Sequence, residues 1–135
     1  MLNRCIKLAS KLENKKQRIY AIIVDKKGRI LSSGTNSYTK SHPLQAYYCE
    51  LATKENHKIF VHAELQALVN LHGQIADKIF VARVSKSGTP LPSSPCPICS
   101  LAIRDAGIKE VITTWQLPIK YVILKSWRTK WKRLS

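Results

Sequence analysis

The chain has 135 residues and a formal net charge of +15, from 23 Lys and Arg against 8 Asp and Glu. This length is enough for a single domain, residues 1–135, that buries a core without disulfide bonds. No stretch approaches the ~20 apolar residues of a membrane span, and the first residues lack the apolar segment of a signal peptide. We therefore expect a soluble intracellular protein with no membrane partner.

The positive charge lies mainly at the two ends of the chain. Residues 1–29 hold nine basic and two acidic side chains, and residues 116–135 hold six basic and no acidic ones. Basic segments around a near-neutral centre indicate a polyanion partner, such as single-stranded DNA or RNA, which they would bind by neutralising phosphates. The alternative is an ordinary solvated surface that is rich in lysine.

The first half of the chain predicts a helix, a hairpin and a loop. Apolar residues at helical spacing predict a basic amphipathic helix over residues 2 to about 16. "RIYAIIV", "DKKG" and "RILSSGTN" then predict two strands joined by a turn. The following segment, residues 37–57, has mixed polarity without a clear period, so we expect a loop with about one helical turn.

The second half alternates helices and strands. "VHAELQALVNLHG", from Val61, predicts a helix, and "KIFVARV" predicts a buried strand. The loop "SKSGTPLPSSP" leads to a helix in "CPICSLAIRDAGIK", and "EVITTW" is the next strand. The tail, residues 116–135, is expected to begin as a strand at 121–124 and to end as a basic helix. This order predicts an α/β fold in which helices cover both faces of a central sheet.

Two of the four cysteines, Cys96 and Cys99, stand three positions apart in "SSPCPICS". Such a pair can be half of a structural zinc site, a redox pair or a coincidence. A structural zinc ion needs four protein ligands, and no second Cys pair is present. His62, at the start of the other predicted helix, supplies a third ligand. Three ligands with an open fourth position are typical of catalytic zinc, so we predict one Zn²⁺ per chain.

Glu64 lies two residues after His62, a spacing that does not put both side chains on one face of a helix. It is therefore poorly placed to be a routine structural ligand. A carboxylate beside a zinc site is better suited to proton transfer. We predict that Glu64 is the catalytic acid and base. Cys5 and Cys49, in contrast, are expected to be small buried side chains.

The pattern H-x-E followed by P-C-x-x-C is the signature of zinc deaminases of nucleobases. The sequence resembles the cytidine and deoxycytidylate deaminase superfamily over residues 19–114. That superfamily includes tRNA adenosine deaminases and the AID/APOBEC enzymes. The resemblance implies a three-layer α/β/α fold with a central mixed five-stranded sheet. It also implies hydrolytic deamination of a nucleobase, with His62, Cys96 and Cys99 as zinc ligands and Glu64 as the proton-transfer group.

The resemblance also implies three residues that bind the substrate. The backbone N–H of Ala63 would donate to the base carbonyl, and Asn36 would contact the base or the sugar. The backbone carbonyl of Ser94 would hold the exocyclic amine. Read without the resemblance, Asn36 is a turn residue beside Gly34, and Ser94 is an ordinary loop residue.

The substrate is predicted from two weaker signals. The sequence Ser-Pro-Cys before the zinc ligands is closer to cytosine deaminases than to tRNA adenosine deaminases. The charge favours conversion of cytosine to uracil in single-stranded nucleic acid. The nucleic acid would be contacted by basic residues in the tail: Lys125, Arg128, Lys130, Lys132 and Arg133. The alternatives are a deaminase of free (deoxy)cytidine or (d)CMP, a tRNA adenosine deaminase, and a non-catalytic nucleic-acid-binding relic. Oligomeric state is not predicted.

Overall fold

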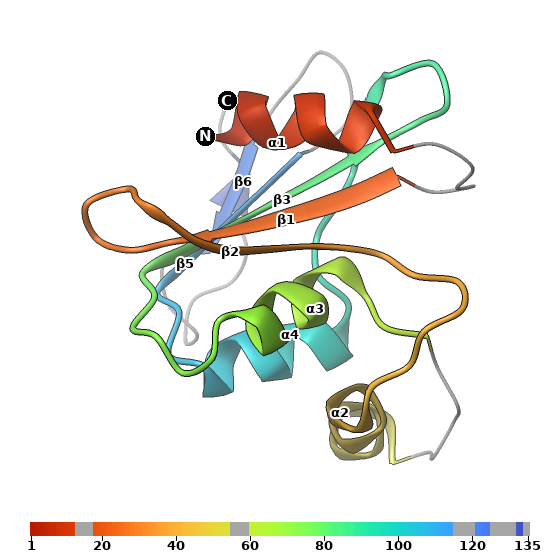
Figure 1. Cartoon of the computed structure of the whole chain (residues 1–135), viewed down its shortest axis with the longest axis vertical. Coiled ribbons are helices and arrows are strands. Elements are labelled where there is room, and N and C mark those ends of the chain that lie inside the picture. Colours follow the sequence, from red (N-terminus) through yellow and green to blue (C-terminus); the bar gives the residue numbers. More distant parts are fainter. Residues whose placement is uncertain (13–17, 55–59, 115–120, 125–131, 134–135) are drawn as a thin grey trace.

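The computed structural model describes residues 1–12, 18–54 and 60–114, together with the backbone of 121–124 and 132–133. The helices and strands in these residues follow one another along the chain as shown in Figure 1. They are α1 (Leu2–Ser10), β1 (Arg18–Val24), β2 (Ile30–Thr35), α2 (Pro43–Thr53), α3 (Ala63–Asn70), β3 (Lys78–Val84), β4 (Pro90–Leu91), α4 (Pro97–Asp105), β5 (Glu110–Thr114), β6 (Tyr121–Leu124) and β7 (Lys132–Arg133).

The strands form one mixed sheet in the order β2-β1-β3-β5-β6-β7, and β4 pairs with β3. β3 and β5 are parallel, whereas the other pairs are antiparallel. Figure 1 shows α1 on one side of the sheet and α3 and α4 on the other. The predicted three-layer α/β/α fold with a mixed sheet is therefore confirmed. Its five longer strands are β1, β2, β3, β5 and β6, and β4 and β7 add two residues each.

Alternation along β1 divides the apolar core between the two faces of the sheet. Ile22 and Val24 pack in a buried cluster with Cys5 and Ala9 of α1. The alternate residues Ala21 and Ile23 face the opposite side, where they join a cluster that includes side chains of α3 and α4. Because successive side chains of a strand point to opposite faces, the run of four buried apolar residues that ends β1 serves both layers.

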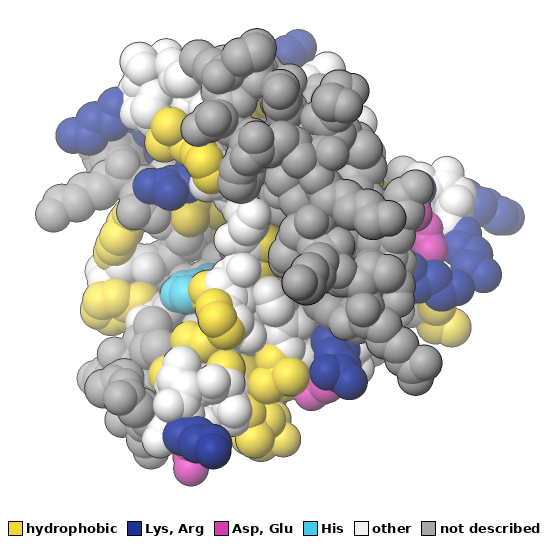
Figure 2. Space-filling view, turned by 180° about the vertical axis from the view of Figure 1, so that it is seen from behind, with side chains coloured by type: hydrophobic (Ala, Val, Ile, Leu, Met, Phe, Trp, Pro, Cys, Tyr) yellow, Lys and Arg dark blue, Asp and Glu magenta, His cyan; other side chains and the backbone are white. Residues whose placement is uncertain are grey.

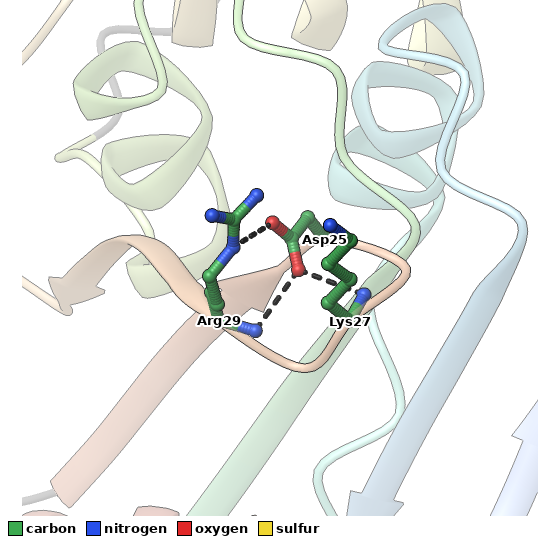
Figure 3. A network of polar contacts seen from close by, with 3 residues as sticks. All are labelled: Asp25, Lys27 and Arg29. Carbon is green, nitrogen blue, oxygen red and sulfur yellow. Dashed lines mark hydrogen bonds and ion pairs between the residues drawn. The ribbon is translucent and has the colours of Figure 1, made fainter.

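A network of polar contacts closes the turn between β1 and β2 (Figure 3). Asp25 Oδ1 accepts the backbone N–H groups of Lys27 and Arg29, each at 2.9 Å, and Arg29 Nε donates to Asp25 Oδ2 at 2.8 Å. Gly28 has a φ of 80°, a conformation that glycine adopts without steric cost. The predicted hairpin is confirmed: β2 pairs antiparallel with β1 and is an edge strand of the sheet.

Gly34 allows β2 to approach α3 at backbone distance. A Cβ atom at this position would lie 2.5 Å from the carbonyl oxygen of Ala63 and 2.5 Å from the backbone nitrogen of Ala67. Both atoms belong to the backbone of α3, so neither can move aside without moving the helix. The absence of a side chain at Gly34 thus sets the distance between the sheet and the helix that begins beside His62.

We expect Gly34→Ala to lower the free energy of unfolding by about 3 kcal/mol, at the upper end of what overpacking costs. Gly28→Ala is the control, because no atom lies within 4 Å of a Cβ there and only the positive φ is strained. Urea unfolding of both variants measures the difference. Equal losses at the two positions would mean that the contact between β2 and α3 is not tight.

The first helix is shorter than predicted. It ends at Ser10 rather than near residue 16, and residues 13–17 lie outside the described part of the chain. Arg18 Nη1 donates to the carbonyl oxygen of Ser10 at 3.3 Å, so a cation lies at the helix C-terminus, where the dipole favours it. No helix in the described residues is long and apolar enough to cross a membrane.

The loop predicted for residues 37–57 was wrong in part, because it contains the helix α2, Pro43–Thr53. His42 caps this helix by accepting the N–H of Leu44 at its Nδ1, and Pro43 occupies the first turn. The fully buried positions of α2 are Gln45 and Cys49, one turn apart. A stripe of one amide and one thiol has no apolar period, so the pattern did not reveal the helix. α2 packs on α4, on the far side of the helical layer (Figure 1).

In the tail, the predicted strand at residues 121–124 is confirmed as β6, which pairs with β5. The basic helix predicted after it is wrong at Lys132 and Arg133, which form β7 and pair with β6. Residues 125–131, with Lys125, Arg128 and Lys130, lie outside the described part of the chain.

Candidate active site

The three predicted zinc ligands meet where α3 and α4 begin. His62 is the N-cap of α3, Cys96 is the N-cap of α4, and Cys99 lies in the first turn of α4. Their ligand atoms all lie within 4.8 Å of one another. His62 Nδ1 is 3.3 Å from Cys99 Sγ and 3.5 Å from Cys96 Sγ. Ligands at zinc bond lengths of about 2.0–2.3 Å in a tetrahedron are about 3.5 Å apart, so this donor set fits zinc.

The charges of these groups suit a cation. Hydrogen bonds from Cys99 and His62 lower the pKa of Cys96 to about 4. The same contacts raise the pKa of His62, chiefly through its hydrogen bond to Cys96. The hydrogen bond to Cys96 and burial raise the pKa of Cys99 well above its usual range. One thiolate is thus already favoured by the protein, and a metal ion would favour the second.

Glu64 lies in the first turn of α3 and its side chain is only 6% exposed. Burial raises its pKa, and a hydrogen bond from backbone N–H and the charge of His62 partly offset that effect. A buried carboxyl beside the ligands, with a raised pKa, can both accept and donate a proton. This is the arrangement that general acid and base catalysis requires.

A cleft of about 500 Å³ opens over these residues. Of the residues proposed for substrate contact, Asn36 and Ser94 line the cleft, whereas Ala63 is buried at the start of α3 and is not part of the lining. Figure 2 shows the molecule from behind, where one histidine side chain reaches the surface among hydrophobic and uncharged ones. The described residues that line the cleft are Ile19, Asn36, Ser37, Tyr38, Phe60, Val61, His62, Glu64, Val81, Arg83, Pro92, Ser93, Ser94 and Cys96.

Asn36 is held at the wall of the cleft by the neighbouring strand. Its Oδ1 accepts the backbone N–H of Ile19 at 3.2 Å, and the residue is 7% exposed. The side-chain amide is therefore oriented by the sheet rather than by a turn around Gly34. The interpretation of Asn36 as a turn residue alone does not fit this contact.

Gln45 supports the zinc ligands and was missed by the sequence analysis. It is fully buried in α2, and its Oε1 accepts the backbone N–H of His62 at 3.2 Å. α2 thus fixes the backbone at the residue that carries the nitrogen ligand. A polar residue at a fully buried helical position would have been the signal, but the helix itself was not predicted.

Ser93 holds the loop that leads to Cys96, although no pattern in the sequence marks it as part of the site. Its hydroxyl donates to the carbonyl oxygen of Val81 at 2.7 Å and accepts the N–H of Thr114 at 2.9 Å. Its backbone N–H donates to the carbonyl oxygen of Thr114 at 3.1 Å. One serine therefore ties the loop to the middle of β3 and to the end of β5, just before the two cysteine ligands.

Residues 1–115 match the family described as "Cytidine and deoxycytidylate deaminase zinc-binding region". The fold is similar to that of dCMP deaminase from the cyanophage S-TIM5, with 26% identity, a TM-score of 0.53, and coverage of 86% of this chain and 83% of that one. It is also similar to cytidine deaminase from Mycobacterium leprae, with 12% identity, a TM-score of 0.54, and coverage of 90% and 89%. No curated protein matches the chain.

The fold, the donor set and this match define a zinc-dependent hydrolase that acts on a C–N bond. Because the matched region covers residues 1–115 of 135, the chain belongs to the cytidine and deoxycytidylate deaminase family. Zinc is the metal of that family, and His62, Cys96 and Cys99 are the residues that can hold it.

Proposed function

We propose that this protein catalyses the hydrolytic deamination of cytosine to uracil in a free cytosine nucleoside or nucleotide. The observation that carries the proposal is the buried carboxyl of Glu64, which lines the same cleft as His62 and Cys96. The cyanophage dCMP deaminase, at 26% identity, supports a free substrate. The sequence Ser94-Pro95-Cys96 supports cytosine over adenine.

The reaction converts cytosine and water into uracil and ammonia. Zinc, when bound by His62, Cys96 and Cys99, supplies the Lewis acidity that lowers the pKa of water toward 7. Glu64 accepts the proton of the attacking water and delivers it to the ring nitrogen next to the amine-bearing carbon. The same carboxyl then carries a second proton to the amine, which departs as ammonia.

The other predicted contacts orient the base. In our proposal the N–H of Ala63 donates to the base carbonyl from the start of α3, and the carbonyl oxygen of Ser94 accepts from the exocyclic amine. Asn36, held by Ile19, contacts the sugar at the wall of the cleft. These contacts hold the amine-bearing carbon next to Glu64, so that little reorganisation is needed during reaction.

The assay that tests the proposal uses the zinc-loaded protein with deoxycytidine, dCMP, AMP, single-stranded DNA, single-stranded RNA and tRNA. Released ammonia and the identity of the product base are scored for each substrate. We expect uracil from dCMP or deoxycytidine and no inosine product. Turnover of an adenine substrate alone, or of no free nucleotide, would contradict the proposal.

A second candidate is deamination of cytosine in single-stranded nucleic acid, which the net charge of +15 favours. On the face shown in Figure 2, the described Lys and Arg side chains lie at several separate places. The basic residues proposed to contact the strand are in the tail, where the structure gives backbone alone for Lys132 and Arg133. Uracil in single-stranded DNA or RNA, with free nucleotides left unchanged, would establish this candidate instead.

A further inference from the structure

Arg83 is a residue of the cleft to which the reaction assigns no role. It lies near the end of β3, where it pairs with Ile19 of β1 and with Leu91 of β4. Two residues earlier on the same strand, Val81 packs in the core on the α3 side of the sheet. Because alternate residues of a strand share a face, Arg83 also points to that side, and it lines the cleft with Glu64 and His62.

The described surroundings of Arg83 leave its charged side chain incompletely paired. Its Nε is buried and forms no hydrogen bond, and among the described residues no carboxylate forms an ion pair with it. Among the described residues that line the cleft, it is the sole Lys or Arg. A half-buried guanidinium without a counter-charge is costly unless an anion completes it. The position is therefore suited to an anionic group that enters with the substrate.

The distance from Asn36 indicates which part of the substrate this is. The order β2-β1-β3 places Asn36, Ile19 and Arg83 in one row across three strands. At about 4.8 Å between neighbouring strands, Asn36 and Arg83 are roughly 10 Å apart. A nucleotide whose sugar contacts Asn36 and whose base lies beside Glu64 can place a phosphate within reach of Arg83.

We propose that Arg83 binds the phosphate of the substrate, so that this enzyme prefers a phosphorylated cytosine nucleotide to the nucleoside. A guanidinium binds phosphate through two parallel N–H···O bonds, which also fixes the orientation of the bound group. The phosphate can be the monoester of a free nucleotide or the diester next to a cytosine in a strand. This inference rests on the proposed deamination of cytosine, and it adds the residue that selects the substrate.

The test compares Arg83→Gln and Arg83→Lys with the wild type on dCMP and deoxycytidine. We expect Arg83→Gln to lower kcat/KM for dCMP about 10- to 100-fold, chiefly through KM, and to change that for deoxycytidine less than about 2-fold. The kcat/KM of Arg83→Lys for dCMP is expected to lie between those of the wild type and Arg83→Gln, because an ammonium keeps the charge but not the paired contact. Lys40→Gln, which removes a cation outside the cleft, is the matched control and should leave both substrates unaffected.

Equal losses on dCMP and deoxycytidine would overturn the inference while leaving the proposed function intact. A binding measurement with zinc-loaded Glu64→Ala protein separates the inference from the proposed function further, because binding of dCMP or deoxycytidine needs no turnover. In that protein, Arg83→Gln should weaken the binding of dCMP by the same factor and leave the binding of deoxycytidine unchanged. An unchanged affinity for dCMP would overturn the inference. If the same substitution weakens the binding of a dT-dC-dT trinucleotide more than that of dCMP, the phosphate that Arg83 binds is that of a strand.

Discussion

Glu64→Gln is expected to lower kcat about 10³- to 10⁴-fold while the protein keeps one zinc ion per chain. Removal of a positioned general acid and base typically costs up to this amount. The amide keeps the size of the carboxyl, so the buried side chain stays packed at the start of α3. We therefore expect no fall in the unfolding temperature.

The measurement combines steady-state turnover of dCMP, metal analysis and thermal unfolding. Glu50→Gln is the matched control, because this carboxylate is exposed on α2 and does not line the cleft. It should leave turnover and zinc content unchanged. Turnover by Glu64→Gln near the wild-type rate would show that another group transfers the protons. A loss of zinc would instead make Glu64 a support of the metal site.

The zinc ligands could be predicted from the sequence because their chemistry coincides with helix starts. His62 and Cys96 each precede a segment with apolar residues at helical spacing, and Pro97 marks the first turn of α4. The alternation of helices and strands then brings both helix N-termini to the same side of the sheet. Signals of this kind can be read from the sequence because each depends only on residues that are close together in the chain.

The support around the ligands could not be predicted because it depends on contacts between distant segments. Gln45 supports His62 from a helix whose buried stripe is polar, and Ser93 reaches Val81 and Thr114 across the sheet. Arg83 stands in "KIFVARV", where the apolar residues around it predict a buried strand and hide a cation that faces the cleft.

The close approach at Gly34 has a similar explanation. In the sequence, Gly34 stands in the predicted strand "RILSSGTN", two residues before Asn36, and nothing there indicates a close approach to a helix. In the structure its φ is not in the left-handed region, and the missing Cβ matters because α3 passes directly over the strand. Which property of a glycine is used becomes visible only once the two elements are packed.

Cys99→Ala is expected to abolish zinc binding and the stabilisation that zinc provides. A ligand that binds only the folded state adds RT ln(1 + [L]/Kd), about 2.7 kcal/mol when zinc is present at 100 times its Kd. The wild type should therefore unfold at a higher temperature in excess zinc than in chelator. Cys99→Ala should unfold at the same temperature in both, because a buried site with one sulfur and one nitrogen ligand holds zinc weakly.

Cys5→Ala is the control, since it also removes a fully buried thiol. Burial raises the pKa of Cys5 to about 12, and its Sγ donates to the carbonyl oxygen of Tyr20, so it is unsuited to bind metal. Its cluster lies on the α1 side of the sheet, away from α3 and α4. This variant should lose some stability but keep the full response to zinc. Zinc retained by Cys99→Ala, or lost in Cys5→Ala, would place the metal elsewhere than between α3 and α4.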